Sequence, residues 1–416
     1  AVANPTLDER PLSVLLPADA SVGNAPHQLV EEGLLVHDLN VTIGGLETHV
    51  LSPTHEVASS TAPSEHVTVE GDETGYTLEN ALVRVEIGAD GTLHSVYDKR
   101  VGRDVLRERG NQLWAYVDRP RAWDAWDIDE TYETAGEEIA TVDSIELVEP
   151  GPLRAAVRVT RTWRSSRFVQ TYRLLAGSSR VDIRTHIDWH ERLMLVRALF
   201  PTGIHAHEAT FETMYGVQRR PTHRNTTWER ARFEASAHRF VDLSEPHYGV
   251  ALLNDAKYGH SAHDGILGVS LVRGPLHPDP FADEGEHDFT YALFPHVGSW
   301  VTGNVTAEAR ALNAPLVAVP TATEAAPRPP FVTSSGLPLG LGALKRAHDR
   351  EGVVLRVYEP HGDRGEAVLT FDRPPRSVRR VNLLEDDTEG DAITVDGATV
   401  RFTVRPFEVV SLLAEL

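Results

Sequence analysis

A period-two alternation of apolar and polar residues near the middle of the chain limits its folds more than any other feature. Val181, Ile183, Ile187 and Trp189 occupy alternate positions. The positions that face the other way are polar: Asp182, Arg184, His186, Asp188 and His190. Successive side chains of a strand point to opposite faces, so this run predicts an antiparallel strand with one buried face and one wetted face.

Similar strand signals recur over more than two hundred residues, whereas helical periodicity is scarce. Residues 83–87 alternate, the turn sequence Gly-Ala-Asp-Gly follows at 88–91, and residues 93–97 return as a hairpin partner. The best short helical candidate is 307–312. Long antiparallel strands with almost no helix predict an all-β fold built around a large sandwich.

The strand signals and the Pro-rich stretches divide the chain into four predicted segments. They are a small β domain at 1–65 with strands at 12–16 and 40–51 and a Ser/Thr/Pro-rich linker at 52–65, a large sandwich at 66–300, a linker or crossing segment at 301–335, and a terminal β-sandwich at 336–416. The chain begins at Ala1 rather than Met, so we expect an excised fragment or a processed chain.

The charge balance and the lack of cysteine exclude several classes of function. The formal net charge of 40 − 61 = −21 argues against nucleic-acid and anionic-membrane partners. Without cysteine there are no disulfides, thiolate nucleophiles or Cys-ligated zinc, and a cytoplasmic protein is compatible with this composition. No run approaches the ~18 apolar residues of a membrane-spanning helix.

The most unusual local composition lies at 123–129, where two tryptophans and three aspartates fall within seven residues. Trp123 and Trp126 are three apart, and Asp124 and Asp127 break the alternation of an ordinary strand. Indole faces stack on sugar C–H faces and carboxylates accept hydrogen bonds from hydroxyls, so the stretch suits carbohydrate. A strand end with core-filling indoles and turn-capping aspartates is the alternative that the residues leave open.

Other chemical motifs are weak. Two groups contain residue types that ligate metals, namely His260, His263 and Asp264, and His277, Asp279, Asp283 and His287. Neither group has the His-Glu-x-x-His spacing of a helical zinc site. The sequence contains no Gly-x-Ser-x-Gly elbow, Walker loop or dinucleotide fingerprint. Paired carboxylates for glycosidic cleavage stay open among 61 acidic residues, and Arg273 before Gly-Pro is a plausible hydroxyl or carboxylate clamp.

The order of short motifs along the chain resembles a known family. They are 79–85 (Glu-Asn-Ala-Leu-Val-Arg-Val), 91–99 (Gly-Thr-Leu-His-Ser-Val-Tyr-Asp-Lys), 110–114 (Gly-Asn-Gln-Leu-Trp), 123–127, Asn254-Asp255 with Tyr258-Gly259, 271–275 (Leu-Val-Arg-Gly-Pro), 283–293, 313–315, 343–345, 355–359 and 405–408. This series resembles the C-terminal half of a glycoside hydrolase family 38 α-mannosidase of the bacterial and cytosolic type. The resemblance covers essentially the whole chain.

The resemblance implies a retaining exo-α-mannosidase that acts on mannose-containing oligosaccharides with one zinc ion and an aspartate nucleophile. In that family the nucleophile and most of the zinc ligands lie in an N-terminal α/β domain, and this sequence shows no such pattern. We therefore expect a galactose mutarotase-like supersandwich flanked by smaller β-sandwich domains, with no catalytic residue and no metal ligand in this chain. The residues expected near sugar are Trp123, Asp124, Trp126, Asp127, Tyr258, Arg273, Asp283 and His287.

This interpretation also predicts that the isolated chain is inactive, that its partner is the missing catalytic domain, and that the whole protein is cytoplasmic. Homo-oligomerisation stays undecided. Two alternatives of other classes stay open, a stand-alone carbohydrate-binding β protein and a mutarotase-like epimerase or lyase.

Overall fold

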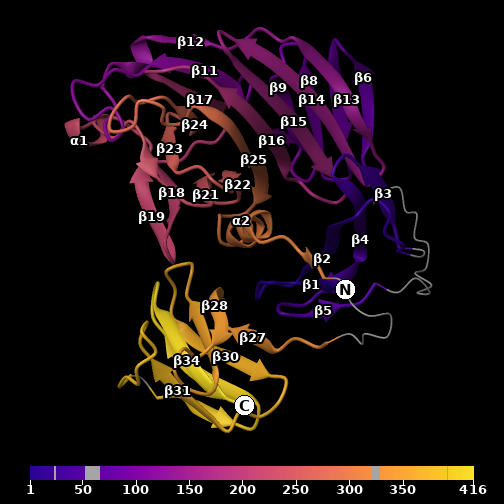
Figure 1. Ribbon diagram of the computed structural model, residues 1–416, viewed down its shortest axis with the longest axis vertical. Helices are drawn as coiled ribbons and strands as arrows, with labels where there is room; N and C mark the ends of the chain where they lie inside the picture. The colour runs from indigo at the N-terminus through magenta and orange to yellow at the C-terminus, as the bar shows by residue number, and fades with distance from the viewer. Residues whose placement is uncertain (23–24, 52–65, 320–327, 391) are drawn as a thin grey trace. The chain divides into compact units, whose positions relative to one another are not determined.

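The computed structural model describes residues 1–22, 25–51, 66–319, 328–390 and 392–416. The chain divides into two compact units, each described by itself below (Figure 1). Unit 1 comprises Ala1–Ser59, Thr213–Val217 and Ala314–Leu416, and unit 2 comprises Ser60–Glu212 and Gln218–Asn313. The predicted boundaries at 65, 300 and 335 stay predictions.

The largest element of unit 2 is a nine-stranded antiparallel sheet with the order β13-β14-β15-β16-β25-β22-β21-β18-β19. Its strands are β13 (Ser144–Pro150), β14 (Arg154–Trp163), β15 (Ser166–Leu175), β16 (Val181–Trp189), β25 (Gly285–Val297), β22 (Tyr248–Asn254), β21 (Phe240–Ser244), β18 (Glu208–Thr213) and β19 (Gly216–Pro221). Burial alternates along β16 from Val181 to Trp189, which confirms the strand and the buried face that its sequence predicts.

Two further sheets complete unit 2. The five-stranded sheet has the order β10 (Arg103–Asp104), β9 (Leu93–Asp98), β8 (Val83–Gly88), β7 (Gly75–Glu79) and β6 (Thr68–Asp72). The six-stranded sheet has the order β12 (Gly136–Glu138), β11 (Gln112–Val117), β17 (Met194–Pro201), β24 (Ile266–Arg273), β23 (Gly259–His263) and β20 (Ala235–Ser236).

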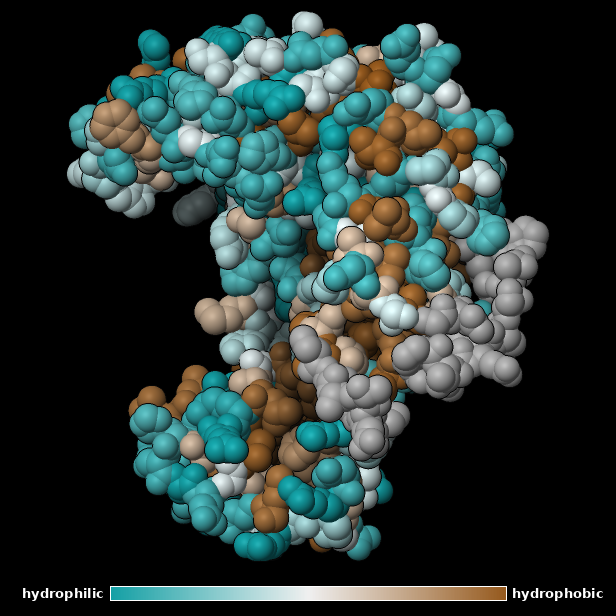
Figure 2. Space-filling model, turned by 45° about the vertical axis from the view of Figure 1, so that its right-hand side comes forward, coloured by the Kyte–Doolittle hydropathy of each residue, from teal (hydrophilic) through white to brown (hydrophobic). Residues whose placement is uncertain are grey.

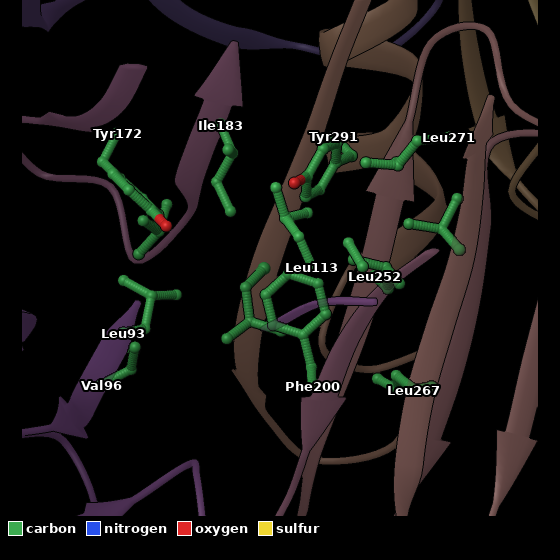
Figure 3. Close-up of a cluster of buried hydrophobic side chains, with 14 of the residues drawn as sticks. Leu93, Val96, Leu113, Tyr172, Ile183, Phe200, Leu252, Leu267, Leu271 and Tyr291 are labelled. Atoms are coloured by element: carbon green, nitrogen blue, oxygen red, sulfur yellow. The ribbon is translucent and has the colours of Figure 1, made fainter. Parts of the chain in front are cut away.

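One continuous apolar core joins the three sheets of unit 2 into a sandwich. Figure 3 shows Leu93 of β9, Phe200 of β17 and Leu267 of β24 in the same cluster as Tyr172 of β15 and Tyr291 of β25. The large sandwich therefore packs the nine-stranded sheet against the five- and six-stranded ones, and apolar burial of this extent dominates its stability.

The predicted hairpin is present as β8 and β9, which pair in an antiparallel manner. Its turn needs glycine at position 91, where φ is +66° and an added Cβ would lie 2.5 Å from the Arg161 side chain. A Cβ is disfavoured by both the left-handed backbone and this close approach. Arg161 itself is buried and donates from Nη2 to the carbonyl of Asp90 at 2.8 Å.

Helices are short within the described residues. They are η2 (Tyr132–Thr134), a 3₁₀ turn, and the α-helices α1 (Thr227–Arg230) and α2 (Val305–Asn313). α2 contains the stretch 307–312 that the sequence marks as helical, and it packs on β21 and β22. Each described helix falls short of the length and apolar character of a membrane-spanning helix.

The N-terminal part of unit 1 holds two three-stranded sheets. Their strands are β2 (Arg10–Leu16), β4 (Gly33–Ile43) and β3 (His27–Val30) in one, and β26 (Val317–Ala318), β1 (Val2–Ala3) and β5 (Thr48–His49) in the other. The strand expected at 40–51 begins earlier, because β4 pairs with β2 along its length and ends before Gly44. The predicted linker at 52–65 lies outside the described residues.

The C-terminal part of unit 1 consists of two four-stranded antiparallel sheets. One contains β27 (Val332–Gly336), β30 (Gly365–Phe371), β33 (Thr399–Val404) and β32 (Thr394–Asp396), and the other β28 (Gly340–Arg346), β29 (Val353–Tyr358), β34 (Val409–Glu415) and β31 (Ser377–Val381). Their inward residues share one core. The predicted all-β fold with antiparallel sandwiches is confirmed. Hydrophilic residues cover much of the molecular face shown in Figure 2.

Candidate functional site

The stretch at 123–129 is neither a strand nor a core element but part of the loop that connects β11 to β12. Trp123 has a φ of +60°, and its carbonyl accepts hydrogen bonds from the backbone N–H groups of Trp126 at 2.7 Å and Asp127 at 2.9 Å. This tight turn leaves the indoles of Trp123 and Trp126 72% and 67% exposed. Their rings meet edge to face, with centroids 6.1 Å apart.

The loop is anchored over the six-stranded sheet by a second, smaller apolar cluster. Tyr132 of η2 is buried there against Tyr116 of β11, with ring centroids 5.1 Å apart, and against Phe233 at 6.2 Å. The buried Arg197 of β17 donates from Nη1 to the Tyr132 hydroxyl and from Nη2 to Ser261 Oγ, each at 2.7 Å. A buried, charge-assisted hydrogen bond therefore fixes the base of this β11–β12 connection, residues 118–135, which we call the tryptophan loop.

Arg273, at the end of β24, ties three segments of the chain together. Its Nε donates to the carboxylate of Asp118, its Nη2 donates to the carbonyl of Asp127, and its backbone N–H donates to Asp283 Oδ2 at 3.0 Å. Arg273 thus binds groups of the protein itself, and its predicted contact with sugar stays a prediction.

Burial of Asp118 is the electrostatic cost of this arrangement. Desolvation raises the pKa of the Asp118 carboxyl, and the hydrogen bond and charge of Arg273 oppose that rise. Asp118 Oδ1 is buried and has no hydrogen-bond partner within the part of the chain that the structure describes. The Arg273 pair therefore compensates a carboxylate that would otherwise be an isolated buried charge.

The carboxylates of Asp124 and Asp283 each accept a hydrogen bond from a backbone N–H group of another segment. Asp124 Oδ2 accepts from the backbone N–H of Leu276 at 2.7 Å, and this bond is the main cause of its lowered pKa. The carbonyl of Asp283, a residue with a φ of +61°, lies 2.7 Å from His287 Nε2. Four of the eight predicted residues thus join one hydrogen-bonded network, namely Asp127, Arg273, Asp283 and His287, whereas Asp124 binds the backbone of Leu276 separately.

Tyr258 lies on a neighbouring loop, between β22 and β23, and is 61% exposed. Its ring meets His238 edge to face at 5.6 Å. The adjacent Lys257 covers the ring of Phe289, with Nζ 4.1 Å from the centroid, and burial lowers the pKa of its amine while Asp283 opposes that change. The charge of Asp283 thus links the Tyr258 loop electrostatically to the Arg273 network.

The arrangement suits contact with a sugar more readily than bond cleavage. Two exposed indoles on a hydrogen-bonded turn offer apolar faces, and the carboxylates of Asp124 and Asp127 are their neighbours in the chain. Throughout the described ranges, no group of three or more His, Asp or Glu side chains is arranged to hold a metal ion. The described residues therefore do not fit the zinc ion that the family resemblance implies.

Family comparison agrees with this picture. The description "Glycosyl hydrolases family 38 C-terminal domain" matches residues 78–281, and "Glycosyl hydrolases family 38 C-terminal beta sandwich domain" matches 339–412. The first match contains the tryptophan loop, Arg273 and Tyr258. The chain belongs to glycoside hydrolase family 38, as a C-terminal region of that family.

Individual relatives carry the name of an α-mannosidase. The chain is 37% identical over 361 residues to "Alpha-mannosidase 2C1" of Homo sapiens, covering 84% of this chain and 34% of that protein. It is 33% identical over 349 residues to "Alpha-mannosidase G" of Dictyostelium discoideum, covering 80% and 32%. The chain thus spans about a third of the length of these curated relatives.

A solved structure supports the fold alone. The crystal structure of an alpha-mannosidase from Enterococcus faecalis V583 superposes with a TM-score of 0.71 at 18% identity, covering 100% of this chain and 50% of that one.

Proposed function

We propose that this chain is the C-terminal β region of a retaining exo-α-mannosidase that hydrolyses terminal α-mannosides of mannose-containing oligosaccharides. The observation that carries the proposal is the tryptophan loop, 118–135. It lies inside the family match and holds two exposed indoles on a base fixed by Arg197 and Arg273. Exposed indoles on a base held by hydrogen bonds suit a ligand-binding role.

In this proposal the chemistry resides on a separate catalytic domain, which is this chain's main partner. That domain supplies the aspartate nucleophile and the zinc ion, and the β region supplies structural support and loops that border the substrate. Trp123 and Trp126 would stack on the sugar, and Tyr258 would face it from the neighbouring loop. The proposal also places the protein in the cytoplasm, a compartment with which a cysteine-free sequence is consistent.

The first test is catalytic. The purified chain alone should not hydrolyse an aryl α-mannoside and should not retain stoichiometric zinc after dialysis. Joined to, or co-expressed with, the catalytic region encoded upstream in its own gene, it should be active. Hydrolysis by the isolated chain with one bound zinc would refute this division of labour.

The second test concerns the tryptophan loop in the joined enzyme. Replacing both indoles, Trp123→Ala with Trp126→Ala, should raise KM by about tenfold, because stacking on a sugar face contributes roughly 1–1.5 kcal/mol. The value of kcat should change little, since the indoles do not touch the reacting atoms. Val101→Ala, at an exposed site on the β9–β10 turn, is the control and should leave KM unchanged.

A further inference from the structure

A second loop of unit 2 exposes another indole that the site described above does not use. The loop runs from 222 to 234, between β19 and β20, and contains α1. Thr226 caps α1 by accepting from the Glu229 backbone N–H at 3.3 Å. Trp228 of α1 is 76% exposed, the largest exposed fraction among the described tryptophans.

This α1 loop is fastened to the tryptophan loop. Arg224 donates from Nη1 and Nη2 to the two carboxylate oxygens of Glu133 at 2.7 and 2.8 Å, and this pair lowers the pKa of Glu133. Phe233 packs on Tyr132 in the same place. Figure 1 shows α1 beside the connection between β11 and β12. The two loops that carry exposed indoles therefore form one edge of unit 2.

A small cavity of mixed lining lies directly under the α1 loop. Its volume is about 20 Å³, which is room for about one or two hydroxyl-sized groups. Its lining consists of Phe211, Arg220, Pro221, Glu229, Arg232, Ala235, His260, Ser261, Ala262 and His263.

Two polar atoms of this lining are buried and unmatched. Glu229 Oε2, an acceptor, and Arg220 Nε, a donor, have no hydrogen-bond partner among the residues that the structure describes. An unmatched buried polar group costs about 1–3 kcal/mol, so a guest that donates to one and accepts from the other would be favoured. A hydroxyl group does both.

The surroundings of Trp228 favour a sugar over a protein partner. The core of a protein interface usually gathers several apolar side chains. Between 222 and 230, however, Trp228 stands among threonine, asparagine, histidine, arginine and glutamate residues only. An exposed aromatic ring beside hydrogen-bonding groups is a pattern by which proteins bind carbohydrate.

We propose that the α1 loop is a second carbohydrate subsite, in which Trp228 stacks on a pyranose ring and a hydroxyl of that sugar enters the cavity between Arg220 and Glu229. The cavity is too small for a whole ring, so the ring lies at its rim. This inference rests on the proposed function and deepens it. With indoles on both loops, the edge takes an oligosaccharide that occupies more than one subsite rather than a single mannose residue.

The test uses the chain as it stands, with ligand-observed saturation-transfer NMR and two probes, methyl α-mannopyranoside and α-linked mannotriose. Mannotriose should bind more tightly than the monosaccharide. Trp228→Ala should weaken mannotriose binding by about tenfold and leave the methyl glycoside unchanged, since stacking contributes about one such factor. Glu229→Gln, which keeps the size of the side chain, should weaken mannotriose binding severalfold.

The matched control is Arg230→Ala, an exposed change on the same helix, which should have no effect on either probe. The inference is overturned if mannotriose gives no saturation transfer, if Trp228→Ala and Arg230→Ala behave alike, or if Trp228→Ala changes self-association instead. None of these results depends on hydrolysis. The proposed function fails separately, through the activity of the isolated chain or an unchanged KM in the Trp123 and Trp126 variant.

Discussion

At the scale of single residues, loss of the Arg273 side chain should strongly reduce the free energy of unfolding. Arg273→Met would leave the Asp118 carboxylate buried and uncompensated, and we expect a loss of about 3–5 kcal/mol in the free energy of unfolding at pH 7. Urea unfolding measures it. Arg192→Met is the control, because its pair with Glu284 is largely exposed and should contribute about 1 kcal/mol or less.

The pH dependence of the Arg273→Met variant provides a second check. Without the guanidinium, burial should raise the Asp118 pKa further. The folded state would then bind a proton more tightly than the unfolded state, so stability rises as pH falls. The deficit relative to the unmodified chain should shrink between pH 7 and pH 4. A deficit that stays constant or grows over that range contradicts the assignment.

His260 should contribute to acid lability in the opposite sense. It is fully buried, its Nε2 lies 3.2 Å from the Asn254 side-chain nitrogen, and burial lowers its pKa from 6.5 to about 4. The unfolded state therefore binds the extra proton first, and stability present above pH 6.5 is lost as pH falls towards 4. The contribution is up to about 3 kcal/mol.

Replacing His260 by glutamine removes the titrating group while keeping a side chain that forms hydrogen bonds. The variant should lose less stability than the unmodified chain between pH 6.5 and pH 4, measured by urea unfolding at several pH values. Equal losses in the two proteins would show that His260 does not cause the acid lability.

At the scale of elements, η2 decides whether the two indole-bearing loops are ordered. Tyr132→Ala removes the ring that Tyr116 and Phe233 contact, and we expect a loss of about 3–5 kcal/mol. Hydrogen-exchange mass spectrometry should show faster exchange in 119–135 and 222–234. Tyr132→Phe keeps the ring and removes only the hydroxyl, which accepts from Arg197 and donates to Glu133, so it should cost about 1–3 kcal/mol and keep both loops protected. Equal exchange in the two variants would contradict this.

The elements that the sequence predicts well are those whose signal is local. The alternation in β16 and the turn between β8 and β9 each lie within about fifteen residues, and both are present. The helix α2 extends the predicted 307–312 by a few residues, an uncertainty usual for helix ends. The start of β4 is harder to predict, because its first six residues, Gly33–Asp38, are all buried and so lack the alternation of a half-exposed strand.

The site could be predicted only in part, since its contacts join distant segments. The indoles are visible as a composition anomaly, but Asp118 and Arg273 are 155 positions apart, and Glu133 and Arg224 are 91 apart. The residues around Arg197 do not reveal its role in the sequence. The only trace is distant: an added Cβ at Gly268 would lie 2.9 Å from Arg197 Nη2, so glycine leaves room for this side chain. Without the register of β17 with β24, that glycine has no interpretable role.

At the scale of the whole molecule, separate buried clusters should make the two units respond to mutation locally. Leu252 belongs to the core of the large sandwich and Leu412 to that of the C-terminal sandwich, and both side chains are fully buried. Each change to alanine should lower the free energy of unfolding of its own sandwich by about 2–5 kcal/mol, because apolar burial is lost and a cavity remains. Since the clusters share no buried residue, the two effects should add.

Hydrogen-exchange mass spectrometry on the single and double variants tests this division. Leu412→Ala should accelerate exchange in β29, β33 and β34 and leave β16, β22 and β25 unchanged, and Leu252→Ala should do the reverse. Strands of one unit that respond to a mutation in the other would show a cooperative unit larger than either core. In that case the tryptophan loop would also depend on the C-terminal sandwich, and truncating that sandwich would impair sugar binding. If the responses stay separate, the two indole-bearing loops of unit 2 should bind sugar without the C-terminal sandwich.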